Sequence, residues 1–181
     1  MGKVIAQFSL FISKNLWIMA IIGFHGCQKE IKPIPLSLLS SSSVQIESGE
    51  ELKVRMALTT QQQVQGLSGV QDYEFRDDEA MLFFNLEDSL RQFWMPDTYF
   101  NLDIFFLDRN LVVLDVDRDV PHYIGRENPE KIPRAKPVYC RHVFEMKASS
   151  ALSKKIQKGM KLKWTGKFPL EQIELSIRQL Q

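Results

Sequence analysis

The stretch NLDIFFLDRNLVVLDVD, residues 101–117, decides the fold. It consists of two apolar arms, NLDIFFLD and LVVLDVD, each with the length of a strand. Asp108, Arg109 and Asn110 join the arms, and Asn110 tolerates the left-handed backbone conformation that a tight turn demands. The stretch therefore predicts a β-hairpin that contributes to the core of the domain.

Further strands are predicted on both sides of this hairpin. In ELKVRMALT (51–59), apolar residues alternate with mostly polar ones, which is typical of a strand with one buried face. AMLFFNL (80–86) is a short apolar run with the length of a buried strand. Strand character returns in VYCRHVFEMK (138–147) and in MKLKW (160–164). The residues from 118 to 137 hold four prolines and many charges, which predicts a long surface loop.

Two short helices are predicted among these strands. In TTQQQVQG (59–66), Thr59 or Thr60 is suited to cap a helix, with a glutamine three residues later completing a capping box. A second short helix is predicted over 149–157. The tail from Gly166 fits both a strand and a helix by its apolar spacing. Because strands and helices do not alternate regularly, the sequence predicts an α+β domain with a mostly antiparallel, curved or barrel-like sheet and two short helices.

The N-terminal region has the pattern of a secretory signal. Lys3 and Lys14 precede the apolar run LWIMAIIGF (16–24), which is too short to span a bilayer as a helix. The run ends in FHGC, which resembles a bacterial lipobox with Cys27 as the lipidated residue. We therefore expect residues 1–27 to direct export and Cys27 to anchor the chain at the periplasmic face of a membrane. An uncleaved anchor or a simple signal peptide are the alternatives.

The remaining chain divides into a spacer, one domain and an extension. QKEIKPIPLSLLSSSS (28–43) contains two prolines and four consecutive serines, which predicts a flexible tether. The globular domain is expected over 44–166, followed by a C-terminal extension over 167–181. With 23 basic and 22 acidic residues, the whole chain carries a net charge of +1, so no nucleic-acid partner is expected.

Several segments, in this order, resemble one known family. They are QGLSG (65–69), EAMLFF (79–84), FWMPDT (93–98), LDIFFLD (102–108) and VFEMKASSALSKKIQKGMKLKW (143–164). Together they are similar to the domain of unknown function 192 family, over roughly residues 52–164. The resemblance implies a small domain that is often exported, and it supplies no established chemistry.

A candidate ligand site lies at the corner FWMPDT, where Trp94, Met95, Asp97 and Thr98 lead into the predicted hairpin. Pro96 fixes its own φ and favours an extended Met95, and Asp97 is suited to accept backbone N–H groups in an Asx-turn. One interpretation is that Trp94 and Met95 plug the end of the core. The other is that Trp94 offers a flat aromatic surface to a small ligand such as a sugar.

Two carboxylates within apolar strands are candidates for chemistry. Asp103 shares a strand face with Phe105 and Leu107, and Glu145 lies between Val143 and Lys147 on its face. A carboxylate in such surroundings is either paired or has a perturbed pKa. If Asp103 and Glu145 converge, they could act as acid and base in hydrolysis. Satisfaction of both by structural partners is the alternative.

Cysteine and histidine provide a weaker hypothesis. Cys140 and His142 lie two apart in an extended segment, with His122 in the preceding loop, so a nucleophile pair or a metal site is conceivable. No metal-ligand spacing, phosphate loop or dinucleotide motif is present, so we expect neither a metal nor a cofactor. The sequence thus predicts a lipid-anchored binding or accessory domain of the cell envelope, holding a small ligand or an envelope protein at the corner. An envelope hydrolase using Asp103 and Glu145 is the alternative.

Overall fold

The computed structural model describes residues 34–179. The signal-like segment, Cys27 and the beginning of the predicted tether lie outside these residues. The described elements, in chain order, are the 3-10 turn η1 (Leu36–Leu38), β1 (Ser40–Gln45), β2 (Glu51–Ala57), α1 (Thr60–Gln65), η2 (Asp72–Glu74), β3 (Glu79–Phe83), β4 (Ser89–Arg91), β5 (Leu102–Leu107), β6 (Val113–Val120), β7 (Val138–Cys140), β8 (His142–Lys147), α2 (Ala151–Lys155), β9 (Lys163–Trp164) and α3 (Leu170–Arg178).

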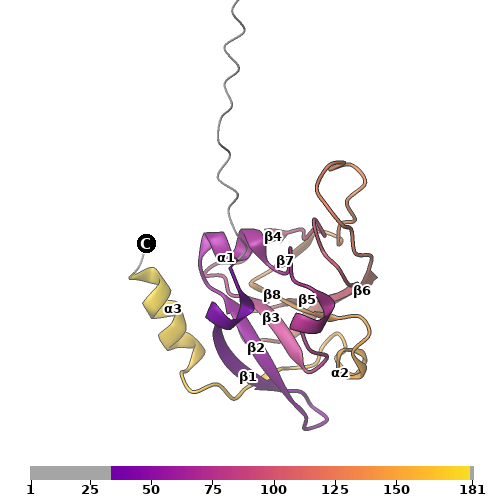
Figure 1. The fold of residues 1–181 in the computed structure, drawn as a ribbon. Helices are drawn as coiled ribbons and strands as arrows, with labels where there is room; N and C mark the ends of the chain where they lie inside the picture. The colour runs from indigo at the N-terminus through magenta and orange to yellow at the C-terminus, as the bar shows by residue number, and fades with distance from the viewer. Residues whose placement is uncertain (1–33, 180–181) are drawn as a thin grey trace, which may run out of the picture. The chain divides into compact units, whose positions relative to one another are not determined.

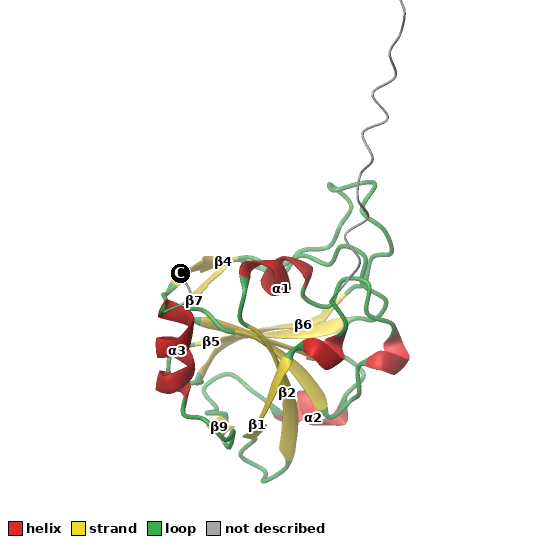
Figure 2. Cartoon of the chain, turned by 60° about the vertical axis from the view of Figure 1, so that its left-hand side comes forward, coloured by secondary structure: helices red, strands yellow, loops and turns green. Residues whose placement is uncertain are grey.

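Seven strands form one twisted sheet in the order β6-β5-β8-β3-β2-β1-β9, and β4 and β7 form a separate two-stranded ribbon. Among the described strand pairs only β2–β3 is parallel, so the sheet is mixed but mostly antiparallel. The sheet curls into a half-barrel, and short helices lie around it (Figures 1 and 2). The predicted α+β class, with strands dominating, is confirmed.

Each face of the sheet carries its own apolar cluster, because successive side chains of a strand point to opposite sides. We call one face the corner face, which bears Met81, Ile104 and Val143 and packs against Met95 of the corner. We call the other the helix face, which bears Phe105 and Phe144, among others, and packs against Ile173 and Ile177 of α3. The domain therefore has two cores, one on each side of a single sheet.

The hairpin formed by β5 and β6 confirms the central sequence prediction, with all six residues of β5 buried. Its turn differs from the expectation, because the left-handed residue is Leu111, with φ of 62°, and not Asn110. The Asp108 carboxylate accepts the N–H groups of Asn110 at 2.7 Å and Val112 at 2.8 Å. These bonds, together with the full burial of Leu111, hold the unusual conformation in place.

The helices follow local sequence signals. Thr59 caps α1 in a capping box with Gln62, and the Ser150 hydroxyl caps α2 by accepting two backbone N–H groups. The apolar spacing of the tail fits both a strand and a helix. The tail forms α3, in which Ile173 and Ile177 are one helical turn apart and both are buried. Within residues 34–179, no helix combines the length and apolarity needed to cross a bilayer.

The predicted tether boundary is wrong for residues 34–43. Leu36 and Leu39 are buried in the corner-face cluster, and Ser40–Ser43 pair with β2 as part of β1. The Gln65 side chain also binds both the N–H and the C=O of Ile34. The composition of a serine run predicts a linker, yet the backbone of serine residues can pair with a neighbouring strand like the backbone of other residues. The packed domain therefore begins about ten residues earlier than predicted.

Candidate functional site

The predicted corner is fastened to the loop that follows β6. The N–H groups of Met95, Asp97 and Thr98 donate to carbonyls of Pro133, Gly125 and Tyr123 at 2.9–3.1 Å. Met95 is fully buried, and Thr98 is buried with its hydroxyl donating to the Met95 carbonyl at 2.9 Å. The chain turns at this corner as predicted. Met95 and Thr98 are held in its interior, where they are not available to a ligand.

Trp94 and Asp97 are the accessible members of the corner. Trp94 is 42% exposed, and the Arg134 guanidinium lies over its ring at 5.2 Å from the centroid. The predicted Asx-turn is absent, because no residue in 34–179 donates to the Asp97 carboxylate; Asp97 instead adopts a left-handed φ of 53°. Trp94 therefore does not plug the core, and its outer face is already covered by an arginine.

This exposure predicts a small effect of Trp94 on stability. Trp94→Ala removes one cation–π contact and the buried part of a ring that is 42% exposed, so we expect the free energy of unfolding to fall by about 1–2 kcal/mol. Urea unfolding followed by circular dichroism measures this. A loss above about 3 kcal/mol, as for a fully buried tryptophan, would mean that the ring is part of the core.

Asp103 is a fully buried and fully partnered carboxylate. It accepts from Arg118 at 2.7 Å, from Lys154 at 3.2 Å, from the Asp119 N–H at 2.9 Å and from the Ser153 hydroxyl. Burial opposes ionisation of Asp103, but the hydrogen bonds from Ser153, Asp119, Arg118 and Lys154 outweigh it and hold its pKa below the ordinary value. Asp103 therefore joins β5 to β6 and α2 as a structural anion.

Glu145 is in the opposite situation. It lies on the corner face between its register neighbours Met81 and Ile104, and only 4% of it is exposed. No residue in the described part of the chain donates a hydrogen bond to its carboxyl group. Burial raises the pKa of Glu145 to about 8, so the group is mostly protonated at neutral pH.

The two carboxylates do not converge, which contradicts the hydrolase alternative. In the β5–β8 register, Asp103 is opposite Met146 of the helix face, and Glu145 is opposite Ile104 of the corner face. Paired residues of neighbouring strands share a face, so Asp103 and Glu145 point to opposite sides of the sheet. A substrate cannot reach both.

Cys140 and His142 are also separated, contrary to the pairing hypothesis. Cys140 belongs to the corner-face cluster, whereas the His142 ring packs, tilted, against the Phe84 ring of the helix face, with the ring centroids 4.6 Å apart. Burial raises the pKa of the Cys140 thiol to about 11. Burial, followed by Arg141 and Arg91, lowers the pKa of His142 to about 4, and its Nδ1 accepts the Asn85 N–H at 3.1 Å. Within residues 34–179 no three His, Cys, Asp or Glu side chains are grouped to hold a metal.

An inert thiol is the resulting prediction for Cys140. In a Cys27→Ser chain, Ellman's reagent should modify Cys140 at least about 100-fold more slowly in the folded than in the unfolded protein, because the thiolate is scarce and buried. Absorbance at neutral pH, with and without denaturant, gives both rates. Equal rates would mean that the thiol is open to solvent.

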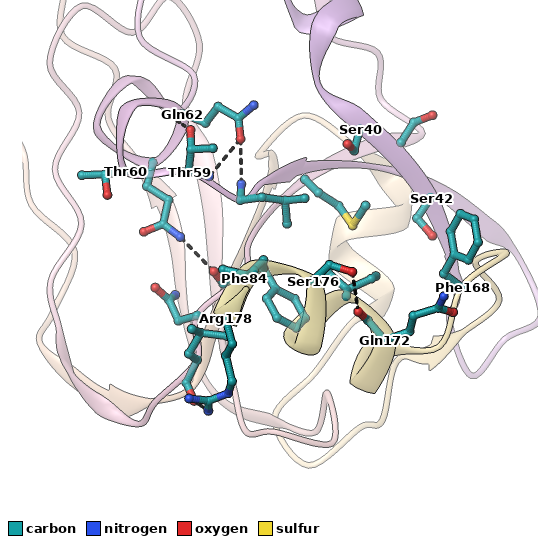
Figure 3. Close-up of a pocket in the computed structure, with 18 of the residues that line it drawn as sticks. Ser40, Ser42, Thr59, Thr60, Gln62, Phe84, Phe168, Gln172, Ser176 and Arg178 are labelled. Carbon is teal, nitrogen blue, oxygen red and sulfur yellow. Dashed lines mark hydrogen bonds between the residues drawn. The ribbon is translucent and has the colours of Figure 1, made fainter. Parts of the chain in front are cut away.

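A large hollow of the described domain lies elsewhere, on the helix face. A groove of about 1130 Å³ runs along α3 and is closed on its other side by β1 and α1 (Figure 3). Its apolar lining comes from the sheet, from the segment after β3 and from α3. The residues of this apolar lining are Met56, Leu58, Phe84, Leu86, Ile173 and Ile177, together with Phe168 just before α3.

The rest of the groove lining is mostly neutral and polar. It consists of hydroxyl and amide side chains on β1, α1, Asn85 and α3, of which Ser40, Ser42, Thr60, Gln62, Gln63 and Gln172 are examples. Three cations, Arg91, Lys167 and Arg178, and one anion, Glu87, complete it. The groove therefore offers an apolar surface with many uncharged hydrogen-bonding groups and an excess of positive charge.

Sequence reasoning missed this groove for two reasons. Its β1 wall was assigned to a flexible tether, and its α3 wall was left between strand and helix. The signals that could have found it are Ile173 and Ile177 at helical spacing beside the polar Gln172 and Ser176. None of the six predicted site residues, Trp94, Met95, Asp97, Thr98, Asp103 and Glu145, lines the groove.

Comparisons with known proteins agree with the fold. No match is found among curated proteins. A solved structure from Sinorhizobium meliloti 1021, provisionally described as a transcription regulator, is 25% identical with a TM-score of 0.55, and the match covers 70% of this chain and 95% of that one. A protein of unknown function from Novosphingobium aromaticivorans DSM 12444 is 24% identical with a TM-score of 0.55, covering 70% and 85%. This second likeness concerns the fold alone.

The sequence match to a family extends over most of the described domain. A family model described as domain of unknown function 192, uncharacterized ACR, matches residues 43–164. The matched range runs from β1 to β9 and includes the hairpin, the corner and α2. The chain belongs to the domain of unknown function 192 family.

Proposed function

We propose that this protein is a ligand-binding domain of the bacterial cell envelope, held at the membrane by a lipid on Cys27, and that its ligand occupies the groove beside α3. The observation that carries the proposal is the groove itself, which combines an apolar lining with uncharged polar walls. Concave sites of a few hundred to about 1,000 Å³ with this mixture of surfaces are typical of small-molecule sites.

The walls of the groove support a role particular to this chain. Ser40–Ser42 of β1 and the residues from Lys167 to Arg178 lie outside the range 43–164 that matches the family. The groove thus consists of a shared sheet and of two added segments. Binding sites are commonly grafted onto folds in this way, so the family's fold and this chain's ligand are separate questions.

Filling the groove tests the proposal. Ser176 lines the groove, and its hydroxyl donates to the Gln172 carbonyl within α3. We expect a small-molecule extract of the native envelope to raise the melting temperature of the full-length chain, and we expect Ser176→Trp to abolish this rise because the indole occupies the groove.

The matched control is Leu175→Trp, which adds the same ring at the neighbouring, exposed position of α3 outside the groove lining. It should respond to the extract like the wild type. A rise that survives Ser176→Trp would move the binding site away from the groove.

The proposed anchor has an independent test. Cys27→Ser should release the exported chain from the membrane fraction into the soluble periplasmic fraction, because one residue then no longer carries the lipid. Immunoblotting of the separated fractions measures this. A variant that stays with the membrane would instead indicate an uncleaved N-terminal anchor.

A further inference from the structure

We infer that the ligand of the groove is a short, polyhydroxylated chain bearing carboxylates, that is, an acidic glycan. This inference rests on the proposed function and names the chemical class that the groove would recognise. Three features of the groove support it: the fixed orientation of its amides, the short length of β1 edge left open beside it, and the position of its cations.

The amides of the groove are held at one end and free at the other. The Gln62 carbonyl oxygen accepts the Thr59 N–H at 3.0 Å, and the Gln62 NH₂ group has no partner among the residues that the structure describes. The Gln63 NH₂ group donates to the Phe84 carbonyl at 2.8 Å, and the Asn85 NH₂ group donates to the Phe83 carbonyl at 3.0 Å. The carbonyl oxygens of the Gln63 and Asn85 side chains have no hydrogen-bond partner within residues 34–179.

Such fixed groups match hydroxyls. A hydroxyl donates and accepts, so it can bond to the free NH₂ of Gln62 and to the free carbonyls of Gln63 and Asn85. The hydroxyls of Ser40, Ser42 and Thr60 add groups that also do both. Because the amides are already oriented, little side-chain entropy is lost when a ligand binds. The apolar lining then suits the CH-bearing faces of sugar rings.

Two other ligand classes fit less well. An extended peptide would add a strand to a sheet edge, but β9 and the Thr165 N–H, which donates to the Ser43 carbonyl at 3.0 Å, already cover β1 from Ser43 to Gln45. Only Ser40–Ser42 are left to pair with such a strand. Gly166 then packs against the Ser42 side chain, where an added Cβ would come within 1.8 Å of the hydroxyl oxygen. An acyl chain would leave the many hydroxyls and amides without partners.

The charges indicate an acidic ligand. Arg178, near the C-terminal end of α3, pairs with Glu174 through Nε and Nη2 and is half-exposed. Its Nη1 has no partner among residues 34–179. Arg91 adds a second guanidinium to the lining and Lys167 a third cation, against Glu87 as the single anion among the lining residues. A carboxylate on the glycan can therefore accept charge-assisted hydrogen bonds from Arg178.

The test uses one sugar chain with and without its charge. A galacturonate tetramer and its methyl ester are titrated into the full-length chain by isothermal calorimetry. We expect both to bind, the acid about tenfold more tightly, because one charge-assisted hydrogen bond is worth about that factor. Arg178→Gln should bring the two affinities together, whereas Arg126→Gln, an exposed arginine outside the groove, should leave the difference unchanged.

Each of the other outcomes contradicts one part of the proposal: the ligand class, the role of Arg178 or the position of the site. If neither tetramer binds while the envelope extract still raises the melting temperature, the ligand is no glycan but the proposed function stands. If the acid and the ester bind equally to the wild type, the role of Arg178 is wrong. If binding of either survives Ser176→Trp, the glycan site lies outside the groove.

Discussion

Asp103→Ala should lower the free energy of unfolding by about 3–5 kcal/mol, because it leaves Arg118 and Lys154 without the buried anion that they share. The variant also frees the Ser153 hydroxyl and the Asp119 N–H, two donors that depend on the same carboxylate. We expect the contact between the hairpin and α2 to loosen first, since Asp103 is the group that joins them. Urea unfolding of the variant and the wild type measures the loss.

The matched control is Asp115→Ala. Asp115 of the same hairpin pairs with Lys136 of the following loop at 3.0 Å, but both side chains are about one-third exposed or more. Pairs of this kind contribute up to about 1 kcal/mol. A loss for Asp103→Ala that is no larger than the loss for Asp115→Ala would contradict the assignment of Asp103 as a structural anion.

The pH dependence of Asp103 has a defined sign. Its pKa is lowered in the folded state, so its contribution is present above the ordinary aspartate pKa and is lost as the pH falls through the folded value. Asp103→Ala should therefore differ least from the wild type in acid.

Glu145→Gln should stabilise the protein increasingly as the pH rises. The unfolded carboxyl loses its proton near pH 4.5, whereas the folded one keeps it to about pH 8, so folding of the wild type must retain a proton that the solvent would remove. Through this group alone, the free energy of unfolding of the wild type falls by about 2–3 kcal/mol between pH 5 and pH 7. The variant keeps the shape of the side chain and has no proton to lose.

Urea unfolding at pH 5, 6 and 7 measures the gap between variant and wild type. Glu130→Gln, in the exposed loop, serves as the control and should show no such gap. If the gap for Glu145→Gln stays constant across these pH values, the Glu145 carboxyl is ionised in the folded protein and has found a partner.

The sheet was predictable because its signals are local. The alternation in β2, the apolar runs of β3 and β5 and the capping box at Thr59 each depend on a few neighbouring residues. The turn of the hairpin was harder to predict. Asn110 has the sequence preference for a left-handed conformation, but the Asp108 carboxylate and the burial of Leu111 decide which residue adopts it.

The site was not predictable because it depends on register and on packing between distant segments. Whether Asp103 and Glu145 share a face is decided by the pairing of β5 with β8, which sequence alone cannot align to one residue. The groove requires a serine-rich strand and the C-terminal helix to meet the same face of the sheet. Composition assigned the first to a linker, and periodicity left the second undecided.

The most direct test of the groove as a binding site is native mass spectrometry of the full-length chain, purified gently from its own envelope. We expect a stoichiometric extra mass on the wild type and on Leu175→Trp, and none on Ser176→Trp. An extra mass that remains on Ser176→Trp, or a wild type that carries none even after incubation with the envelope extract, would contradict it.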